Sequence, residues 1–572
     1  MTRQSFAGRP ASAGVALGRL YRPDRPPAAT GPRRAGADPV AEVEDAFDAV
    51  AKHLAVLSDS LRVGGRTEQA DIMEVNSYLA QDPDLRAAAA RRVAVGAPVA
   101  VAVREAVAEY ADAIGALDDP SLAERATDIR QVGRRALAWL HGAELAGPAG
   151  PVVLLAHEIG AADLLEPGTE VVAAASVTGG PNSHAAIVAR SLGIPLILGL
   201  DPAALDLPDG TEALVDAAGP HVTVRPEPAE RALALAAMAA ARSRRVALAA
   251  ERHLPSETLD RHSVILRANV ATAEDADAGL RAGADGVGLL RTELPFLDAP
   301  SWPSEAQHTA ALAPALRLLA GRPVTVRTLD FADDKLPPFL AAGDPAGAGA
   351  ADPAGAAGRR IGRGLPLMLA RPDAFAAQFR ALLTAGAGAD LRIMIPMVAT
   401  VEELRACRDI LYATADALGV PAPPIGVMVE LPEAVALADE LAEEAAFLSI
   451  GSNDLTGQIL RLDRRDPAAT PALTAHPEVL RAIGRVVEAA HRHRRQVSVC
   501  GDAAAHPLVM PLLVGLGCDI LSAAPAALDE IRARIRRLDA ETCALAAREA
   551  LAAGTVEEVW KIVEERCSPE LP

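Results

Sequence analysis

One histidine follows a short glycine-rich stretch directly before an apolar helical pattern. The segment "GGPNSHAAIVARSL", residues 179–192, places His184 in the first turn of the predicted helix, with Asn182 or Ser183 as the N-cap. The helix dipole and unpaired backbone N–H groups at such a position disfavour imidazolium and favour an anion on or near the ring. A neutral imidazole is a nucleophile, so His184 could accept a phosphoryl group. The alternative is an ordinary turn with an incidental histidine.

A second group of polar side chains follows successive strand-like segments in the C-terminal half. Its members come at the end of an apolar run or in the loop after it: Arg291, Arg327, Glu430, Asn453, Asp454, Arg464 and Cys500. In a barrel of parallel strands these ends meet at one face, so we predict that the side chains line one site. Arginines offer planar, charged forks for phosphate and carboxylate oxygens. The group therefore predicts a site for a small, highly charged anion.

Two acids, a cysteine and a lysine could add to this chemistry. Glu430 and Asp454 are hard oxygen ligands of the kind that Mg²⁺ prefers beside substrate oxygens; the alternative is a structural ion pair with nearby arginines. Cys500 could be an ordinary buried cysteine or a proton donor whose pKa is tuned by burial and cations. Lys335, in "DFADDK", could face the substrate or form a surface ion pair.

The apolar patterns predict an α/β multidomain protein that positions these residues. Strand-like segments flank a long helical pattern, which predicts an α/β domain over 1–36 and 146–225 with a helical insertion over 37–145. A charged, alanine-rich run predicts a helical linker over 226–262. Eight strand candidates alternate with helices over 263–572, as in a C-terminal (β/α)8 TIM barrel. The low-complexity segment 341–358 is expected to be a mobile loop on that barrel.

Composition narrows the class of protein. A length of 572 residues suggests about three or four domains. The formal net charge of −19 argues against a nucleic-acid partner, because phosphate backbones require a basic face. No signal-peptide core and no apolar segment of membrane-spanning length is present in the sequence. Five scattered cysteines without a C-x-x-C spacing argue against a zinc site or a disulfide framework. We therefore expect a cytoplasmic protein without membrane insertion.

The motifs taken together resemble a known family. "GGPNSHAAIVARSLGIP" is similar to the phosphohistidine segment of the PEP-utilising enzymes, and successive barrel motifs of that family resemble "GVGLLRTE", "VRTLDFADDK", "IGVMVELP", "SIGSNDLT" and "VCGD". "ASAGVALG" at the start and "DIRQVGRRAL" in the helical insertion extend the likeness over nearly the whole chain. The order and spacing resemble the Enzyme I family of the bacterial phosphoenolpyruvate:sugar phosphotransferase system.

The resemblance implies a reaction, a cofactor and partners. His184 would take the phosphoryl group of phosphoenolpyruvate and pass it to a histidine of the carrier protein HPr, with release of pyruvate, as the first step of sugar uptake. Cys500 would protonate enolpyruvate, and Glu430 and Asp454 would bind Mg²⁺. The α/β domain would swivel on the linker, the helical insertion would dock HPr, and the barrel would form a homodimer. The substrate-binding residues would be Arg291, Arg327, Lys335, Arg360, Asn453, Asp454 and Arg464.

The chain departs from the family pattern at several positions. Pro181 and Asn182 replace the usual Arg-Thr, Asp502 stands where glutamate is usual, and the loop containing "DPAGAAGRRIGR" is longer and lacks an asparagine. Asp163 is the nearest polar residue in the stretch where the family has a threonine that orients the imidazole. These departures leave open a catalytically weak regulatory homologue that acts by partner binding, or an Enzyme I of a nitrogen-regulatory or dihydroxyacetone-type phosphorelay.

Related dikinases and synthases of the same family are excluded by the sequence. Pyruvate phosphate dikinase and PEP synthase add a large ATP-binding domain to the histidine and barrel domains. This chain carries no Walker-type G-x-x-x-x-G-K-[ST] motif, and its length leaves no room for that domain.

Overall fold

The computed structural model describes most of the chain. The described residues are 3–23, 38–63, 67–115, 120–142, 150–165, 169–180, 184–296, 299, 301–331, 337, 340, 364–462 and 470–567. The backbone alone is described at residues 60, 62–63, 67–69, 71–72, 115, 120–124, 184, 187 and 191. The chain divides into two compact units, Met1–Arg245 and Val246–Pro572. The division falls inside helix α8 (Pro228–Ala250), which lies within the predicted linker.

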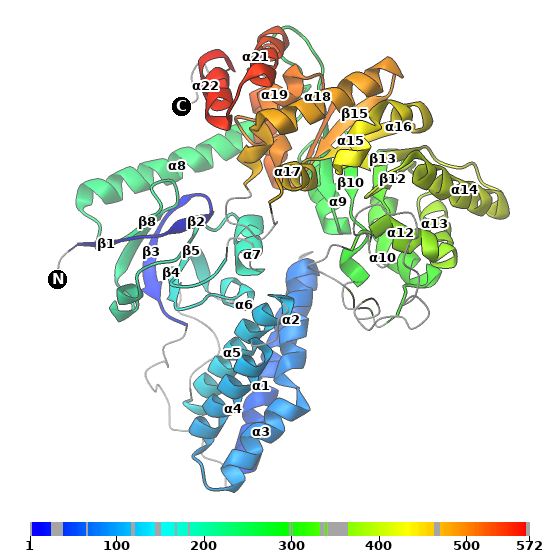
Figure 1. The fold of residues 1–572 in the computed structure, drawn as a ribbon. Coiled ribbons are helices and arrows are strands. Elements are labelled where there is room, and N and C mark those ends of the chain that lie inside the picture. Colours follow the sequence, from blue (N-terminus) through cyan, green and yellow to red (C-terminus); the bar gives the residue numbers. More distant parts are fainter. Residues whose placement is uncertain are drawn as a thin grey trace. The chain divides into compact units, whose positions relative to one another are not determined.

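The first unit contains an eight-stranded sheet whose central strands are parallel (Figure 1). The strand order is β1-β8-β7-β3-β4-β5-β6-β2. On β4, Val152 and Leu154 pack into one apolar cluster and Val153 and Leu155 into another. Both faces of the strand are therefore buried, which explains its unbroken apolar run. The strands are β1 Gln4–Ala7, β2 Arg9–Ser12, β3 Val15–Tyr21, β4 Pro151–Ala156, β5 Glu170–Ser176, β6 Leu196–Leu198, β7 Glu212–Asp216 and β8 His221–Val224.

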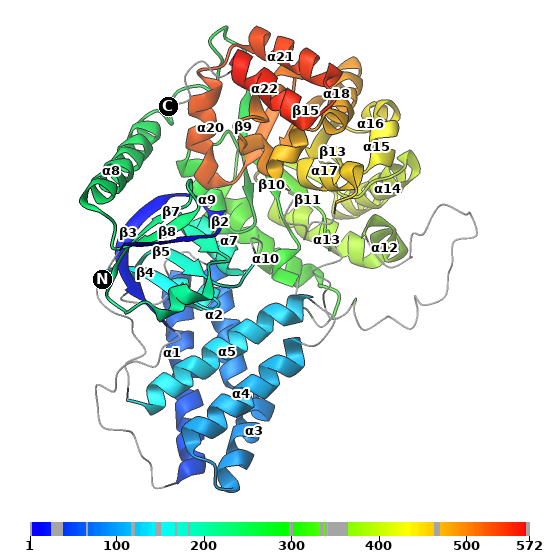
Figure 2. The same cartoon turned by 60° about the vertical axis from the view of Figure 1, so that its left-hand side comes forward.

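Five long helices of the first unit run alongside one another as a bundle (Figures 1 and 2). On α1, Val43, Phe47, Val50 and Leu54 recur every three or four residues, and all four are buried. This spacing places one apolar stripe toward the other helices of the bundle. The helices of the unit are α1 Pro39–Val63, α2 Thr67–Ala80, α3 Pro83–Ala94, α4 Val99–Gly115, α5 Pro120–Leu140, α6 Ala161–Leu164, α7 His184–Leu192, η1 Pro202–Asp206 and α8.

The second unit is built around a closed barrel of eight parallel strands. All eight strands coincide with apolar runs that the sequence singled out. The predicted fold class, an α/β multidomain protein with a helical bundle and a C-terminal (β/α)8 barrel, is therefore confirmed. The strands are β9 Ile265–Val270, β10 Val287–Leu290, β11 Pro323–Arg327, β12 Asp390–Ile395, β13 Ile425–Val429, β14 Phe447–Gly451, β15 Gln496–Cys500 and β16 Ile520–Ala523.

Helices surround this barrel and bury its outer face (Figure 2). No described helix, in either unit, is long and apolar enough to cross a membrane. The predicted mobile loop 341–358 lies outside the described residues. The helices are α9 Ala273–Arg281, η2 Leu294–Phe296, α10 Glu305–Leu318, α12 Gly364–Ala370, α13 Pro372–Ala385, α14 Val401–Leu418, α15 Pro432–Ala436, α16 Ala438–Glu444, α17 Ser452–Leu460, η3 Pro471–Ala475, α18 Pro477–Arg492, η4 Asp502–Ala505, α19 Met510–Gly515, η5 Pro525–Ala527, α20 Leu528–Ile535, α21 Ala540–Ala552 and α22 Val556–Cys567.

Candidate active site

The C-terminal ends of the barrel strands bring six of the predicted residues to one face. Each residue is the last of a strand or follows it within a few positions, and parallel strands of a barrel end at a common face. Lys335, Arg360 and Arg464 lie outside the described residues. The six are Arg291 after β10, Arg327 at the end of β11, Glu430 after β13, Asn453 and Asp454 in the first turn of α17 after β14, and Cys500 at the end of β15.

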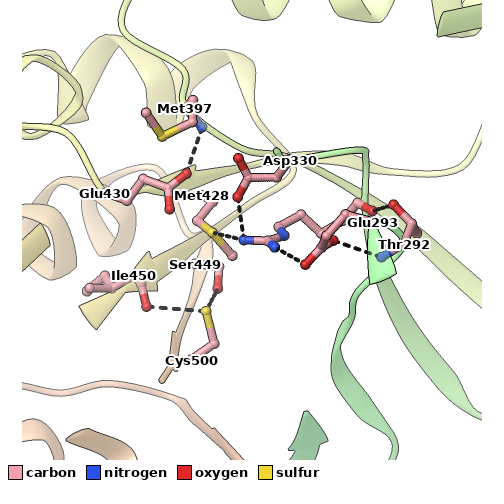
Figure 3. A network of polar contacts seen from close by, with 10 residues as sticks. Thr292, Glu293, Asp330, Met397, Met428, Glu430, Ser449, Ile450 and Cys500 are labelled. Carbon is pink, nitrogen blue, oxygen red and sulfur yellow. Dashed lines mark hydrogen bonds and ion pairs between the residues drawn. The ribbon is translucent and has the colours of Figure 1, made fainter. Parts of the chain in front are cut away.

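Arg327 lies between two carboxylates at this face. Its Nη2 donates to Glu293 Oε1 and its Nη1 to Asp330 Oδ2, both at 2.7 Å, and all three side chains are about nine-tenths buried. Figure 3 shows Glu293 and Asp330 with Glu430 and Cys500 nearby. Burial alone would lower the pKa of Arg327, but the charges of Glu293, Asp330 and Glu430 raise it above its ordinary value. The guanidinium is therefore a permanent cation at the mouth of the barrel.

A hydrogen-bonded network that the sequence did not predict holds the backbone of Arg327 in place. Gln378, on α13 and fully buried, donates to Thr292 Oγ1 and accepts from the N–H of Leu329, both at 3.1 Å. The Thr292 hydroxyl in turn donates to the Arg327 carbonyl at 2.9 Å. The network ties the ends of β10 and β11 together. No sequence signal marks Gln378, because "AFAAQFRALL" reads as an ordinary amphipathic helix.

Glu293 is a second residue that the sequence analysis missed. It lies in the quoted motif "GVGLLRTE", where only the arginine was chosen as a functional residue. Its Oε2 accepts the N–H of Thr292 at 3.1 Å while Oε1 accepts from Arg327. Its position at a strand end, next to a predicted arginine, was the signal that could have identified it.

Cys500 lies inside the barrel as a buried thiol. It is 3% exposed, receives a hydrogen bond from Ser449 Oγ and donates one to the Ile450 carbonyl, both at 3.5 Å (Figure 3). Burial raises the pKa of Cys500, and the Ser449 hydrogen bond and the charge of Arg327 oppose that rise only in part. The thiol therefore keeps its proton at neutral pH and is suited to donate it.

Glu430 and Asp454 offer a donor set that fits a hard divalent cation. Glu430 is fully buried, and its Oε1 accepts the N–H of Met397 at 2.7 Å, which fixes its orientation. A Cβ at Gly451, which precedes the helix of Asp454, would lie 3.1 Å from Glu430 Oε2, so glycine leaves the carboxylate room there. Within the described parts of the chain, no cluster of three or more His, Cys, Asp or Glu side chains could hold a metal alone. Two carboxylates completed by substrate oxygens are the arrangement that Mg²⁺ favours.

Asp502, one of the departures from the family pattern, pairs with a predicted substrate-binding residue. Asn453 Nδ2 donates to Asp502 Oδ2 at 3.2 Å, and the Asp502 N–H donates to Asn453 Oδ1 at 3.3 Å. Gly501 has φ +122°, and a Cβ there would lie 2.3 Å from Ser452 Oγ. A glycine is thus required for this close approach. The aspartate holds the Asn453 amide in a defined orientation.

His184 is the first residue of α7 in the other unit, as the sequence predicted. The helix ends at Leu192, before Gly193 with φ +65°, because glycine adopts this left-handed conformation easily. Pro181 and Asn182 lie outside the described residues, and at His184 only the backbone is described. The helix start places the backbone of His184 where unpaired N–H groups favour anions.

Asp163, the nearest polar residue to the family's threonine position, joins the bundle to the sheet domain. Its carboxylate accepts hydrogen bonds from Gln131 Nε2, Arg134 Nη2 and the N–H of Gly160, each at 3.1 Å. Gln131 and Arg134 belong to α5, and Asp163 belongs to α6. Asp163 therefore forms a charged joint between α5 and α6 of the first unit.

Comparisons with known proteins agree with this architecture. Three domain families match in order: PEP-utilising enzyme, N-terminal, over residues 7–125; PEP-utilising enzyme, mobile domain, over 148–219; and PEP-utilising enzyme, PEP-binding domain, over 245–540. The last of these covers the whole barrel and all six residues at its mouth.

Curated relatives match over almost the entire chain. The phosphoenolpyruvate-protein phosphotransferase of Bacillus sp. (strain S) is 32% identical over 98% of both chains, and that of Streptomyces coelicolor is 36% identical over 96% of both. A multiphosphoryl transfer protein of Xanthomonas campestris pv. campestris is 36% identical over 98% of this chain, which spans 67% of that longer protein. By these matches, the chain belongs to the family of PEP-utilising enzymes that includes the phosphoenolpyruvate-protein phosphotransferases.

Proposed function

We propose that this chain moves the phosphoryl group of phosphoenolpyruvate to His184 and then to a histidine of an HPr-like phosphocarrier protein, with release of pyruvate. The observation that carries the proposal is the cluster at the barrel mouth: a permanently charged arginine, a protonated buried thiol and an oriented carboxylate. A trianionic substrate that must gain one proton needs these three groups. Family membership supports the same reaction.

The phosphoryl step breaks the P–O bond of phosphoenolpyruvate. An imidazole nitrogen of His184 forms the new P–N bond, and the enolate oxygen leaves with the electron pair. Arg291 and Arg327 bind the phosphate oxygens and balance the charge that shifts onto the bridging oxygen. The start of α7 stabilises the phosphorylated ring, because backbone N–H groups at a helix N-terminus attract anions.

The proton step converts enolpyruvate to pyruvate. The Cys500 thiol donates its proton to the methylene carbon of the enolate, and the thiolate regains a proton from solvent. The raised pKa of Cys500 keeps the donor loaded at neutral pH, and the positive charge of Arg327 stabilises the thiolate that forms. The other proposed substrate contacts come from Asn453, Arg464, Lys335 and Arg360.

Mg²⁺ belongs to this proposal. When bound, the ion neutralises charge on the transferring group and polarises its oxygens. Glu430 and Asp454 would hold it, and the buried, oriented carboxylate of Glu430 supports that assignment.

The acceptor, the assembly and the location complete the proposal. The helical bundle α1–α5 would dock the carrier protein, and the barrel would form a homodimer. The names of the full-length relatives, which are phosphoenolpyruvate-protein phosphotransferases, support a protein as the acceptor, and we assign the chain to sugar uptake as part of this proposal. A cytoplasmic location follows from the substrate, because phosphoenolpyruvate is an intracellular metabolite.

Isotope exchange between labelled pyruvate and phosphoenolpyruvate tests the reaction without an acceptor. We expect exchange with the parent protein and Mg²⁺, and its loss in Cys500→Ala and in Glu430→Gln. Cys518→Ala, which removes a buried cysteine outside the site, is the matched control and should exchange normally. A folded parent that shows no exchange would refute the proposed activity and favour a regulatory homologue that acts by partner binding.

A further inference from the structure

The inside of the barrel carries two arginines at its N-terminal end. On β12, Ile393 and Ile395 pack under the surrounding helices, whereas Met394 belongs to a separate cluster within the barrel. Because side chains alternate along a strand, Arg392 shares the inward face with Met394. On β9, Leu266 and Ala268 pack outward in the same way, which places Arg267 on the inward face.

Arg267 is a buried cation whose charge is balanced only in part by the carboxylates around it. It is 5% exposed, and its Nε is buried with no hydrogen-bond acceptor. Over the residues that the structure describes, its guanidinium has no ion pair. Burial, and then repulsion by Arg392, lower the pKa of Arg267 to about 10, although Asp390 and Asp285 oppose the change. The side chain is therefore still charged at pH 7, and burying a charge without an ion pair is costly.

Arg392 reaches across the barrel toward the same space. Its Nη1 donates to Gln496 Oε1 on β15 at 3.4 Å, although β12 and β15 are not neighbours in the barrel. Its Nε is also buried without an acceptor. The nearest carboxylate, Asp390 Oδ2, lies 3.9 Å from Nη2, and the Asp390 side chain is 56% exposed to solvent. Water screens this pair, so it neutralises little of the charge that faces Arg267.

We propose that Arg267 and Arg392 together bind a small inorganic anion, chloride or phosphate, inside the N-terminal end of the barrel. Two guanidinium groups with unused Nε donors supply the charge and the hydrogen bonds that such an anion requires. Gln496 and Asp390 are the first residues of their strands, so this end is opposite to the proposed active site. The site is thus independent of the proposed phosphoryl transfer.

Thermal unfolding of the full chain at constant ionic strength tests the proposal. The background salt is sodium gluconate, whose anion is much larger than chloride or phosphate, and either of these replaces it stepwise. We expect a saturable rise in the melting temperature of the parent with one of the two anions, which identifies the ligand. Arg267→Met should lose this rise. Arg281→Met, which removes an exposed arginine and the same charge, is the matched control and should keep it.

A second variant protects the test against a folding defect in Arg267→Met. Arg392→Gln removes only the more exposed of the two arginines. We expect this variant to need about tenfold more anion to reach half of the full rise in melting temperature, because a charge-assisted hydrogen bond to the anion is lost. Equal anion dependence in the parent and both variants would overturn the proposal and assign the effect to general salt action. A parent without any anion-dependent rise would overturn it as well.

Discussion

Arg327 is the residue on which the charge balance of the barrel mouth depends. It pairs with Glu293 and Asp330, and the charge of Glu430 also acts on it. Arg327→Met leaves these buried carboxylates without their cation. We expect the barrel unit to lose about 3–5 kcal/mol of unfolding free energy in urea, as when one partner of a buried ion pair is removed. Phosphorylation by phosphoenolpyruvate should also be lost.

A compensated variant separates the two roles of this arginine. Arg327→Met combined with Glu293→Gln and Asp330→Asn removes the unpaired charge, so stability should return while phosphorylation stays absent. A stable Arg327→Met protein would contradict the charge-balance account. A phosphorylated triple variant would contradict the role in substrate binding.

The cysteines differ in reactivity because their environments shift the pKa in opposite directions. Burial raises the pKa of Cys500, whereas a hydrogen bond to Cys543 lowers the pKa of the half-buried Cys567. At pH 8 a raised pKa leaves less thiolate, and the thiolate is the form that reacts. Iodoacetamide should therefore modify Cys567 faster than Cys500, because the thiolate fraction of Cys567 is larger. Peptide mass spectrometry measures both rates, and equal rates would contradict this assignment.

At the scale of elements, a charged joint holds the helical bundle against the sheet domain. Gly160 is needed there, because a Cβ at this position would lie 1.3 Å from Gln131 Nε2. Gly160→Ala would push Gln131 away from Asp163 and break the hydrogen bond that Gln131 donates from α5 to α6. We expect a loss of about 1–3 kcal/mol in the unfolding free energy of the first unit, and slower transfer to the carrier protein.

Gly150→Ala is a control for this prediction at a glycine that precedes β4. A Cβ at Gly150 would have no atom within 4 Å, but φ is +94°. Any loss of unfolding free energy in Gly150→Ala therefore comes from backbone strain alone. If Gly160→Ala were no more destabilising than this control, the joint would not stabilise the contact between the bundle and the sheet domain.

The sequence predicted the elements better than the networks between them. Apolar runs bounded by glycine and proline predicted all eight barrel strands. The C-terminal ends of these strands then identified Arg327, Glu430 and Cys500 as candidate site residues. Gln378 could not be predicted, because its hydrogen-bond partners are far away in the sequence and the pattern of its own helix is ordinary. The spacing that singled out Asp163 could not reveal its hydrogen bonds to α5, because their donors lie about thirty residues away in the sequence.

At the scale of the whole molecule, the proposed chemistry is divided between the two compact units. His184 begins α7 in the first unit, while Arg327, Glu430 and Cys500 line the barrel of the second. In the proposed reaction, the phosphoryl group therefore passes from a site in one unit to a histidine in the other. A helix that connects the units, α8, contains the boundary between them and buries only Ala234 among its residues. Such a helix can change direction at its ends at little cost in lost packing, which suits a swivelling domain.

The most direct test of this account uses phosphoenolpyruvate labelled in its phosphoryl group, with Mg²⁺ and without an acceptor. The parent should acquire about one acid-labile, base-stable label per chain, and addition of HPr should remove it. His184→Ala should acquire none, while its barrel site still binds phosphoenolpyruvate. Label on His184→Ala, or a folded parent that stays unlabelled, would contradict the assignment of His184 as the residue that carries the phosphoryl group.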